Sequence, residues 1–573
     1  MTTVDAELAP LARRWQGAAL ALIAVCAMGL VLGNGWVQDE GPLILQDPRV
    51  HAWSGLWSGF VSPWWPEATG GGLYRPLART LLTLQWMAGG GAPWAFKLGS
   101  LLCYLAAVAA VWTLARRLLP GLPAWIVAAL FAAHPVHTEA VAVAVNQGEA
   151  LVTAVLCAAA ALWLDQRAGR RALGPTAVTI ALLYLAGLGL KEHALLLPVL
   201  LFVAGAAVPR VAGTGQTSRR REWGVLLGLV AIGAAVWAAR TAILGGAVSA
   251  PPAHGLPVEP LPRALTMLGV VPHWVRLLLW PAHLQADYAP LEILPWGGWT
   301  VMHSLGTGLL ALAAGLLAWS WPRRRVVAAG ILWTAVALFP VSNLAAVTGI
   351  VLAERTLMLA SVGAILAVIA AVPDAWWHTP RTRTPLAALA GALVLVGAFR
   401  SAARMPDWHD PVRYVIALSR DAPRSWHTLD AVGTLELEAG HRAEGEARLR
   451  AAMAIAPWHS RAYRTLARAY RSDGLCAAAI PLLETTLRLE PIDQYSRLSL
   501  VACLLDQARY DEARARAVEG AAGPGRALQA AFRAATLTAD SAARARAGAG
   551  RVRLAPFPGG YTDIGAPPGD TRP

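Results

Sequence analysis

Apolar runs separated by short polar loops fill the first 400 residues of the chain, and most runs approach the length that spans a bilayer. We predict eleven transmembrane helices, several of them short enough to indicate tilted or broken helices around a buried site. Their expected ranges are 16–34, 94–115, 122–133, 147–164, 175–190, 194–209, 223–243, 300–319, 326–341, 356–372 and 385–400. The fold class expected from this pattern is an all-α, polytopic membrane protein.

The pattern changes after about residue 403, where the chain becomes rich in Arg, Glu and Ala and reads as polar helices. Pro423, Pro457 and Pro491 follow at intervals of 34 residues, which is the tetratricopeptide period. We therefore predict a short tetratricopeptide-repeat solenoid, with a weaker third copy from about Gln494. Such a solenoid usually presents a concave binding face, although it could instead be a structural cap on the membrane domain. The expected domains are 1–403 (membrane), 404–547 (repeats) and 548–573 (a Pro/Gly-rich tail).

Composition supports this division. Of 573 residues, 56% are apolar and 15% charged, against about 25% charged in soluble domains, which excludes an ordinary soluble enzyme, a disordered chain and a fibrous protein. We attribute much of the net charge of +14 to cytoplasmic Arg clusters and expect no nucleic-acid partner. These clusters are Arg13/Arg14, Arg116/Arg117, Arg167/Arg170/Arg171, Arg219/Arg220/Arg221, Arg323/Arg324/Arg325 and Arg381/Arg383.

The clusters also orient the chain. With the N-terminus inside, all six fall in cytoplasmic segments, and an odd number of spans places the repeats outside the cytoplasm. No convincing cleavage site follows the first apolar run, so we expect that run to remain as a helix. The Ala/Arg-rich composition favours a bacterial inner membrane with periplasmic repeats. The five cysteines lack metal-site spacing and are expected to be packed, while Cys476 and Cys503 could meet across adjacent helices in an oxidising compartment.

The outer loops carry ionisable residues close to membrane ends, where charge is costly and therefore a functional candidate. Asp39 and Glu40 fit a catalytic base or a metal ligand, or else belong to a solvated loop. The HxxHxE cluster of His134, His137 and Glu139 could bind a divalent metal, contact a phosphate or sugar, or serve packing.

Three further positions stand at span ends. Glu149 lies at the start of a span, and Lys191 and Glu192 lie between two short apolar runs, where an ordinary hairpin turn is the alternative. Arg355 opens another span, where a guanidinium suits bidentate phosphate binding but could also extend to lipid headgroups.

These loops carry a family resemblance. The chain resembles the transmembrane-and-tetratricopeptide-repeat O-mannosyltransferases, GT-C glycosyltransferases related to the eukaryotic protein O-mannosyltransferases with eleven spans. The Asp-Glu pair of the first lumenal loop in those enzymes matches Asp39 and Glu40. The other segments that carry the resemblance are YRPL (74–77), HPVHTEAVA (134–142) with NQGE (146–149), KE (191–192), WP…DY (280–288), SNL (342–344) and AERTLMLASVG (353–363).

The resemblance implies a GT-C fold and an inverting transfer of mannose or another hexose from a polyprenyl-phosphate carrier to an acceptor hydroxyl, expected to be a protein Ser or Thr. Asp39, with Glu40 beside it, would be catalytic, and Arg355 and then Lys191 would stabilise the leaving phosphate. The other implied substrate-binding residues are Arg75, His134, His137, Glu139, Glu149 and Glu192. The related enzymes are regarded as metal-independent, and a divalent metal stays open here.

The chain also departs from the family, with fewer repeats than most members and NQGE where relatives often show GRAE or GRAD. The expected partners are membrane lipid, the lipid-linked sugar donor and a protein or peptide acceptor docked by the repeats. Two other functions were considered. A membrane-anchored repeat scaffold would need only one span, and a transporter of lipid-linked saccharide would predict symmetry between halves that is not evident.

Overall fold

The computed structural model describes residues 3–66, 72–208, 216–245, 256–257, 259–288, 293, 295–345, 347–348, 350–522 and 526–547. Within these ranges every regular element is helical. The predicted tail 548–573 lies outside them. The chain divides into two compact units, Met1–Ala462 and Tyr463–Pro573, so the predicted boundary at residue 403 falls inside the first unit. Composition therefore changes about 60 residues before the packing does.

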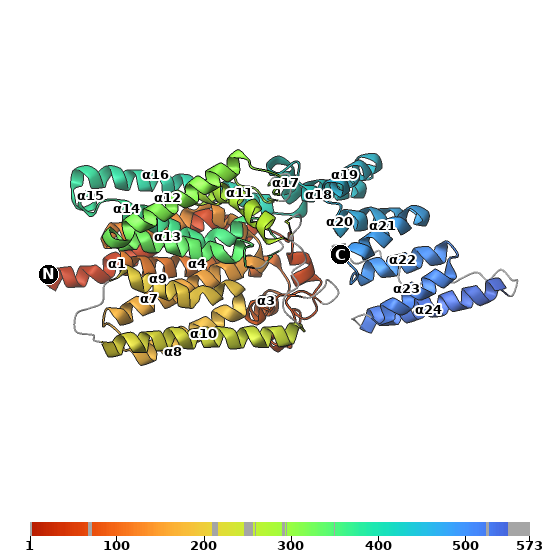
Figure 1. Ribbon diagram of the computed structural model, residues 1–573, viewed down its shortest axis with the longest axis horizontal. Helices are drawn as coiled ribbons and strands as arrows, with labels where there is room; N and C mark the ends of the chain where they lie inside the picture. The colour runs from red at the N-terminus through yellow and green to blue at the C-terminus, as the bar shows by residue number, and fades with distance from the viewer. Residues whose placement is uncertain are drawn as a thin grey trace, which may run out of the picture. The chain divides into compact units, whose positions relative to one another are not determined.

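In the first unit, eight apolar segments among the described residues are long enough to cross a membrane, and most run roughly parallel (Figure 1). Their helices are α1 (Thr3–Met28), α4 (Pro93–Leu118), α7 (Gln147–Arg167), α8 (Leu173–Leu190), α10 (Gln216–Leu244), α12 (Val301–Arg323), α14 (Met358–Ala371) and α16 (Pro380–Arg404). Shorter apolar helices are α5 (Gly121–Ala133), α9 (Leu197–Ala207) and α13 (Arg325–Leu338). The chain is a multi-pass membrane protein. All eleven predicted ranges fall on these helices, and the number that crosses stays a prediction.

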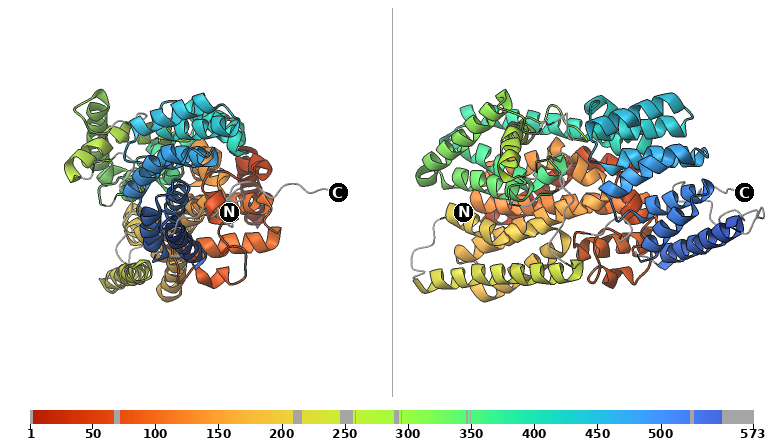
Figure 2. Two further views of the ribbon diagram at one scale, coloured as in Figure 1. Left: turned by 90° about the vertical axis from the view of Figure 1, so that its right-hand side faces the viewer. Right: turned by 45° about the vertical axis from the view of Figure 1, so that its right-hand side comes forward.

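The connections on the α3 side of the first unit hold most of the remaining helices (Figure 2). They comprise α2 (Gly55–Ser58), α3 (Pro76–Gly89), α6 (Thr138–Ala142), α11 (Pro260–Leu279) and α17 (Pro411–Asp421), whereas α15 (Asp374–His378) joins α14 to α16 at the other end. Short 3₁₀ turns interrupt the chain at Pro135–His137, Ala144–Asn146, Glu192–Leu196 and Glu354–Leu357. Each turn lies at or beside a predicted site residue.

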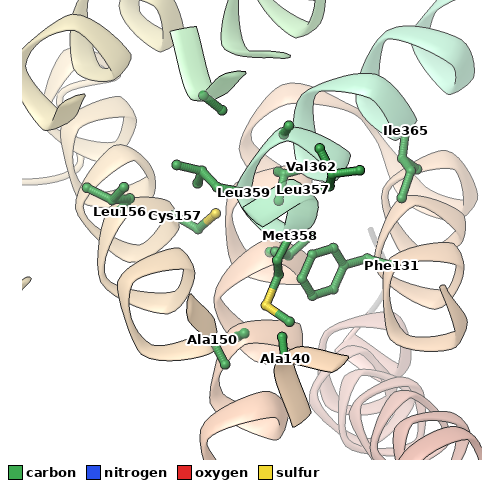
Figure 3. Packing of buried hydrophobic residues seen from close by; sticks show 14 of the residues in the cluster. Phe131, Ala140, Ala150, Leu156, Cys157, Leu357, Met358, Leu359, Val362 and Ile365 are labelled. Atoms are coloured by element: carbon green, nitrogen blue, oxygen red, sulfur yellow. The ribbon is translucent and has the colours of Figure 1, made fainter. Parts of the chain in front are cut away.

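The apolar core of the first unit continues directly into these turns. Figure 3 shows Met358 of α14 packed between Phe131 of α5 and Ala140 of α6, with Ala150 of α7 close by. All four residues are at most 1% exposed. Because Ala140, Ala150 and Met358 follow Glu139, Glu149 and the Arg355 turn closely in sequence, this core fixes where those charges leave it.

A second set of helices has the spacing expected for repeats. Helices α18 (Trp426–Glu438), α20 (Ser460–Ser472) and α22 (Gln494–Asp506) begin 34 residues apart, and so do α19 (Arg442–Ile455), α21 (Cys476–Leu489) and α23 (Tyr510–Ala521). Helix α24 (Arg526–Ala547) follows. Gly433 and Gly445 bring α18 and α19 into backbone contact, because a Cβ on either would lie within 3.0 Å of the other's carbonyl oxygen. In the second unit a disulfide joins Cys476 and Cys503, the pairing that the sequence allowed.

Helices α13 and α14 approach each other through glycine. A Cβ on Gly363 would meet the Gly330 carbonyl oxygen at 2.6 Å and the Thr334 nitrogen at 2.7 Å, and a Cβ on Gly330 would be equally crowded. The neighbouring atoms are backbone and cannot move aside cheaply. This contact sets the position of α14, which begins directly after the 3₁₀ turn that contains Arg355.

We predict that Gly363→Ala destabilises the protein by about 1–3 kcal/mol, because overpacking forces the two helices apart. The measurement is thermal unfolding of the purified protein in detergent. Gly315→Ala is the control, since nothing lies within 4 Å of a Cβ at that position on α12. An equal effect of the two substitutions would show that the α13–α14 contact does not limit stability.

Candidate active site

Six charged residues predicted from the sequence come together at the α3 end of the membrane helices as three ion pairs. We call this group the charged cluster: Arg75, Glu139, Glu149, Lys191, Glu192 and Arg355. Arg75 and Glu192 form a bidentate pair, with Nη2–Oε2 at 2.8 Å and Nε 3.2–3.3 Å from both oxygens. Lys191 Nζ pairs with Glu149, and both side chains are largely buried. Each pair joins segments that are far apart in sequence.

The third pair links the HPVHTE segment to the start of α14. The Arg355 guanidinium contacts Glu139 Oε1, and the backbone N–H of Arg355 donates to Oε2 at 2.9 Å. The Glu139 side chain is 4% exposed, whereas that of Arg355 is 22% exposed. The Arg355 side chain is thus partly exposed, while the Glu139 carboxylate that pairs with it is buried.

Asp39 lies next to the charged cluster and differs in its interactions from the three carboxylates of that cluster. It interacts electrostatically with Arg355, Glu139 and Arg75, yet no ion pair of its own is formed among the described residues. Its side chain is open to solvent, but surrounding protein removes enough water that desolvation raises its pKa, with Arg355 opposing the shift. Asp39 is therefore an accessible carboxylate with raised basicity.

Glu40, its neighbour in sequence, points into the protein. Glu40 Oε1 lies 2.6 Å from Lys97 Nζ, and both side chains are 0% exposed. The carboxylate also accepts hydrogen bonds from the backbone N–H groups of Val37 (2.8 Å) and Ala144 (2.6 Å), and Lys97 donates to the Ala142 carbonyl at 2.8 Å. Adjacent carboxylates thus take different positions, with Asp39 exposed and Glu40 anchoring its loop to α4 and to the 142–144 turn.

The Asp39 loop is held from a second side by the segment after α16. Gly35 N–H donates to the His409 carbonyl at 2.7 Å, and a Cβ at Gly35 would lie 3.0 Å from that oxygen. Asn34 donates to the Met405 carbonyl at 3.1 Å, and Gln38 donates to the Tyr414 hydroxyl. Residues 405–414 belong by composition to the predicted repeat domain, but they pack here as part of the membrane unit.

The two predicted histidines lie inside the protein. His134 Nε2 donates to the Leu278 carbonyl at 3.1 Å, and its Nδ1 accepts from the Val136 N–H. His137 is fully buried, 2.9 Å from both the Tyr104 hydroxyl and the Ser361 hydroxyl. Burial lowers the pKa of His134 to about 4 and holds that of His137 well below its usual value, so both rings are neutral at pH 7. Both rings are used by internal hydrogen bonds, and the choice between metal, substrate contact and packing for this motif stays a prediction.

A metal site is not assembled by these side chains. Over the ranges that the structure describes, no group of three or more His, Cys, Asp or Glu residues has the arrangement needed to hold a metal ion. The carboxylates of the charged cluster each face a cation. The possible divalent metal therefore stays an untested prediction.

Several residues around the site were not identified from the sequence. Lys97 is one, although a single charge within an apolar run was a usable signal. Glu354 is another: it is fully buried and accepts hydrogen bonds from the Tyr288 hydroxyl (2.8 Å) and the Gln285 N–H (2.6 Å). Arg404, at the end of α16, lies 3.8 Å from Glu354 and 3.0 Å from Asp421 of α17. No local pattern joins these segments, so only the fold identifies this network.

The departure at NQGE falls on a buried supporting position. Gln147 is 3% exposed and forms reciprocal hydrogen bonds with Gln85 of α3. It also donates to the Phe96 carbonyl (2.9 Å) and to Ser100 (3.2 Å) of α4. Its amide is therefore used to join α3, α4 and α7, and it does not face Asp39 as a free polar group.

Comparison with known proteins finds distant relatives of part of the chain. The chain is 33% identical over 293 residues to Protein O-mannosyl-transferase Tmtc2 of Drosophila melanogaster, an alignment that covers 47% of this chain and 30% of the relative. It is 34% identical over 169 residues to Protein O-mannosyl-transferase Tmtc1 of the same organism, covering 29% of this chain and 19% of that relative. The chain is distantly similar to these transferases. It spans less than a third of their length, and no protein-family model matches it.

We predict that Lys97→Met lowers stability by about 3–5 kcal/mol, because it leaves the Glu40 carboxylate buried without its cation. The double variant Glu40→Gln/Lys97→Met is expected to recover more than half of this loss, since it removes both charges together. Thermal unfolding in detergent, run as a double-mutant cycle, gives the coupling. Additive losses would mean that the ion pair does not anchor the Asp39 loop.

Proposed function

We propose that this protein is an inverting glycosyltransferase that moves a sugar from a polyprenyl-phosphate carrier to an acceptor hydroxyl on the extracytoplasmic side of the membrane. The observation that carries the proposal is Asp39, an accessible carboxylate that forms no ion pair within the described ranges and lies beside the three ion pairs of the charged cluster. The similarity to protein O-mannosyl-transferases supports the reaction class. The multi-pass membrane unit supports a donor that resides in the bilayer.

In the proposed step, the acceptor O–H lies within hydrogen-bond reach of the Asp39 carboxylate, which accepts the proton as the oxygen attacks. The oxygen forms a bond to the anomeric carbon from the face opposite the phosphate, and the bond between that carbon and the phosphate oxygen breaks. The configuration therefore inverts, and the polyprenyl phosphate leaves with the bonding electron pair. Desolvation makes Asp39 a stronger base than a carboxylate in water.

The charged cluster has two roles in this proposal. Arg355 and Arg75 present partly exposed guanidinium groups next to Asp39, where positive charge stabilises the leaving phosphate. Their carboxylate partners hold them in place while the site is empty. Glu40 acts as a positioning residue, because its side chain is enclosed and reaches only Lys97 and backbone N–H groups.

The acceptor proposed here is a protein Ser or Thr hydroxyl. The helix pairs with 34-residue spacing support a tetratricopeptide solenoid that docks the acceptor chain or another protein. The Cys476–Cys503 disulfide favours an oxidising compartment for these helices, in agreement with the orientation deduced from the Arg clusters. The GT-C fold and an eleven-span topology belong to the same proposal.

We predict that Asp39→Asn lowers the transfer rate by about 10²–10⁴-fold, because the amide cannot accept the proton. The assay uses the purified protein, a polyprenyl-phosphate sugar and a Ser/Thr peptide, with donor binding measured separately and expected to persist. Asp374→Asn is the matched control, since that side chain is 77% exposed at the start of α15. Full activity of Asp39→Asn would overturn the assigned base.

We also predict the pH dependence. The base form of Asp39 is lost as pH falls, so kcat/KM should decline on the acid side at a pH above about 3.9, the ordinary Asp value. Arg355 lowers the pKa of Asp39, so Arg355→Gln should move this limb to higher pH, besides lowering the rate. The pH profiles of the two proteins test this, and an unmoved acid limb would contradict the coupling.

A further inference from the structure

The cations predicted to stabilise the donor phosphate are already matched by carboxylates. Lys191 is paired with Glu149 inside the protein. Arg75 donates from its Nε and Nη2 to the Glu192 carboxylate. A phosphate binding to either must compete with the carboxylate that is already there. A cation whose hydrogen-bond donors are unused would bind a phosphate without that competition.

Arg240, near the end of α10, has this property. It is 4% exposed, and its Nε and Nη1 are buried with no hydrogen-bond partner among the described residues. Its guanidinium stacks over the Trp237 ring at 4.5 Å, a contact that leaves the in-plane N–H groups unused. Burying unsatisfied N–H groups of a charged side chain is costly, so the residue calls for an explanation beyond packing.

The position of Arg240 on the helix excludes simple extension to lipid headgroups. Leu226, Leu229 and Gly233 form the buried stripe of α10, and Arg240 continues it two turns further on. The opposite face, with Leu227, is exposed along an apolar span. The guanidinium therefore sits on the protein side of a helix whose other side is available to lipid.

His193 has the same property. It is 8% exposed, and both of its ring nitrogens are buried without a hydrogen-bond partner in the described part of the chain. Arg240 and His193 each interact electrostatically with Arg75 and Glu192, so both unsatisfied side chains lie within electrostatic reach of one ion pair of the charged cluster. Helix α10 packs there against α8 and α9, which bracket Lys191 and His193 (Figures 1 and 2).

We propose that Arg240 and His193 form the binding site for the phosphate of the lipid carrier, with Arg240 donating its unused N–H groups to the phosphate oxygens. A phosphate group carries negative charge and several acceptor oxygens. It would supply the hydrogen-bond partner that neither side chain has among the described residues. The hydrocarbon chain of a carrier in the bilayer can pack on the exposed apolar face of α10, an interaction that a soluble phosphate lacks. This inference rests on the proposed function: Arg240 and His193, outside the family motifs, bind the phosphate of the carrier, and Arg355 and Arg75 stabilise the charge that develops as it leaves.

The test measures equilibrium binding of undecaprenyl phosphate to the full chain in phosphatidylcholine nanodiscs, with inorganic phosphate as a soluble competitor. Arg240→Leu should weaken binding by about ten- to hundredfold, the loss expected when charge-assisted hydrogen bonds are removed. His193→Ala should weaken it several-fold. Arg323→Leu is the control, because Arg323 is an exposed residue at the C-terminal end of α12. This variant should bind undecaprenyl phosphate as tightly as the wild type does.

Thermal unfolding separates this role from a structural one. Arg240→Leu should leave the Tm unchanged or raise it, since an unsatisfied buried charge is removed. Arg79→Leu is the contrasting variant: Arg79 is 2% exposed and donates to Ser62 and to the carbonyls of Pro63 and Trp64, so its loss should lower the Tm. A similar fall in the Tm for Arg240→Leu would make Arg240 structural and overturn the inference.

The binding outcomes also distinguish this inference from the proposed function. If the wild type and Arg240→Leu bind the carrier equally, the inference fails while the glycosyltransferase proposal stands. If the wild type does not bind undecaprenyl phosphate, both the inference and the polyprenyl-phosphate donor are overturned. If inorganic phosphate competes as strongly as the carrier, the lipid source assigned here is wrong.

Discussion

The structure depends on the pairing of charges where the apolar helices end. A charge that leaves water without a partner costs several kcal/mol, and the buried carboxylates Glu40, Glu139 and Glu149 each have a cation from another segment. The Glu139–Arg355 pair joins positions 216 residues apart, and the Glu40–Lys97 pair joins positions 57 apart. These pairs therefore hold the loops against one another. The apolar core packs the helices together but does not by itself fix the positions of the loops. In the proposed function these loops carry the chemistry, and the ion pairs set their geometry.

The same requirement makes Asp39 conspicuous. Its neighbours in sequence and space are satisfied, with Glu40 enclosed by Lys97 and backbone N–H groups and Glu139 engaged by Arg355. Asp39 has charged neighbours but forms no ion pair with the residues that the structure describes, and desolvation raises its pKa. An anchored loop with one free carboxylate is a preorganised arrangement for proton transfer, because little reorganisation is needed when the substrate arrives. Arg240 is the cationic counterpart, with unsatisfied N–H donors on a helix that borders lipid.

Connections between the membrane helices and the first polar helices extend this arrangement. Glu354 precedes Arg355 and lies 3.8 Å from Arg404, which pairs in turn with Asp421 at the end of α17. Asp287, in the connection between α11 and α12, accepts a hydrogen bond from Ser425, the residue that caps α18. A displacement of α17 or α18 would therefore be transmitted to Glu354, the residue next to Arg355. The first polar helices are part of the frame around the site, which explains why composition and packing change at different positions.

The sequence by itself determined the apolar helices, because lipid exposure demands long apolar runs that are visible without knowledge of their neighbours. It also indicated the charged residues of the site, since charge at a span end is rare enough to be noticed. It could not separate Asp39 from Glu40, which share one motif, nor show that His137 faces the core. Only the tertiary structure decided these roles, because they depend on partners such as Lys97 and Tyr104 that lie far away in the chain. Arg240 was part of an ordinary span in the sequence, and only packing shows that its donors are buried and unused.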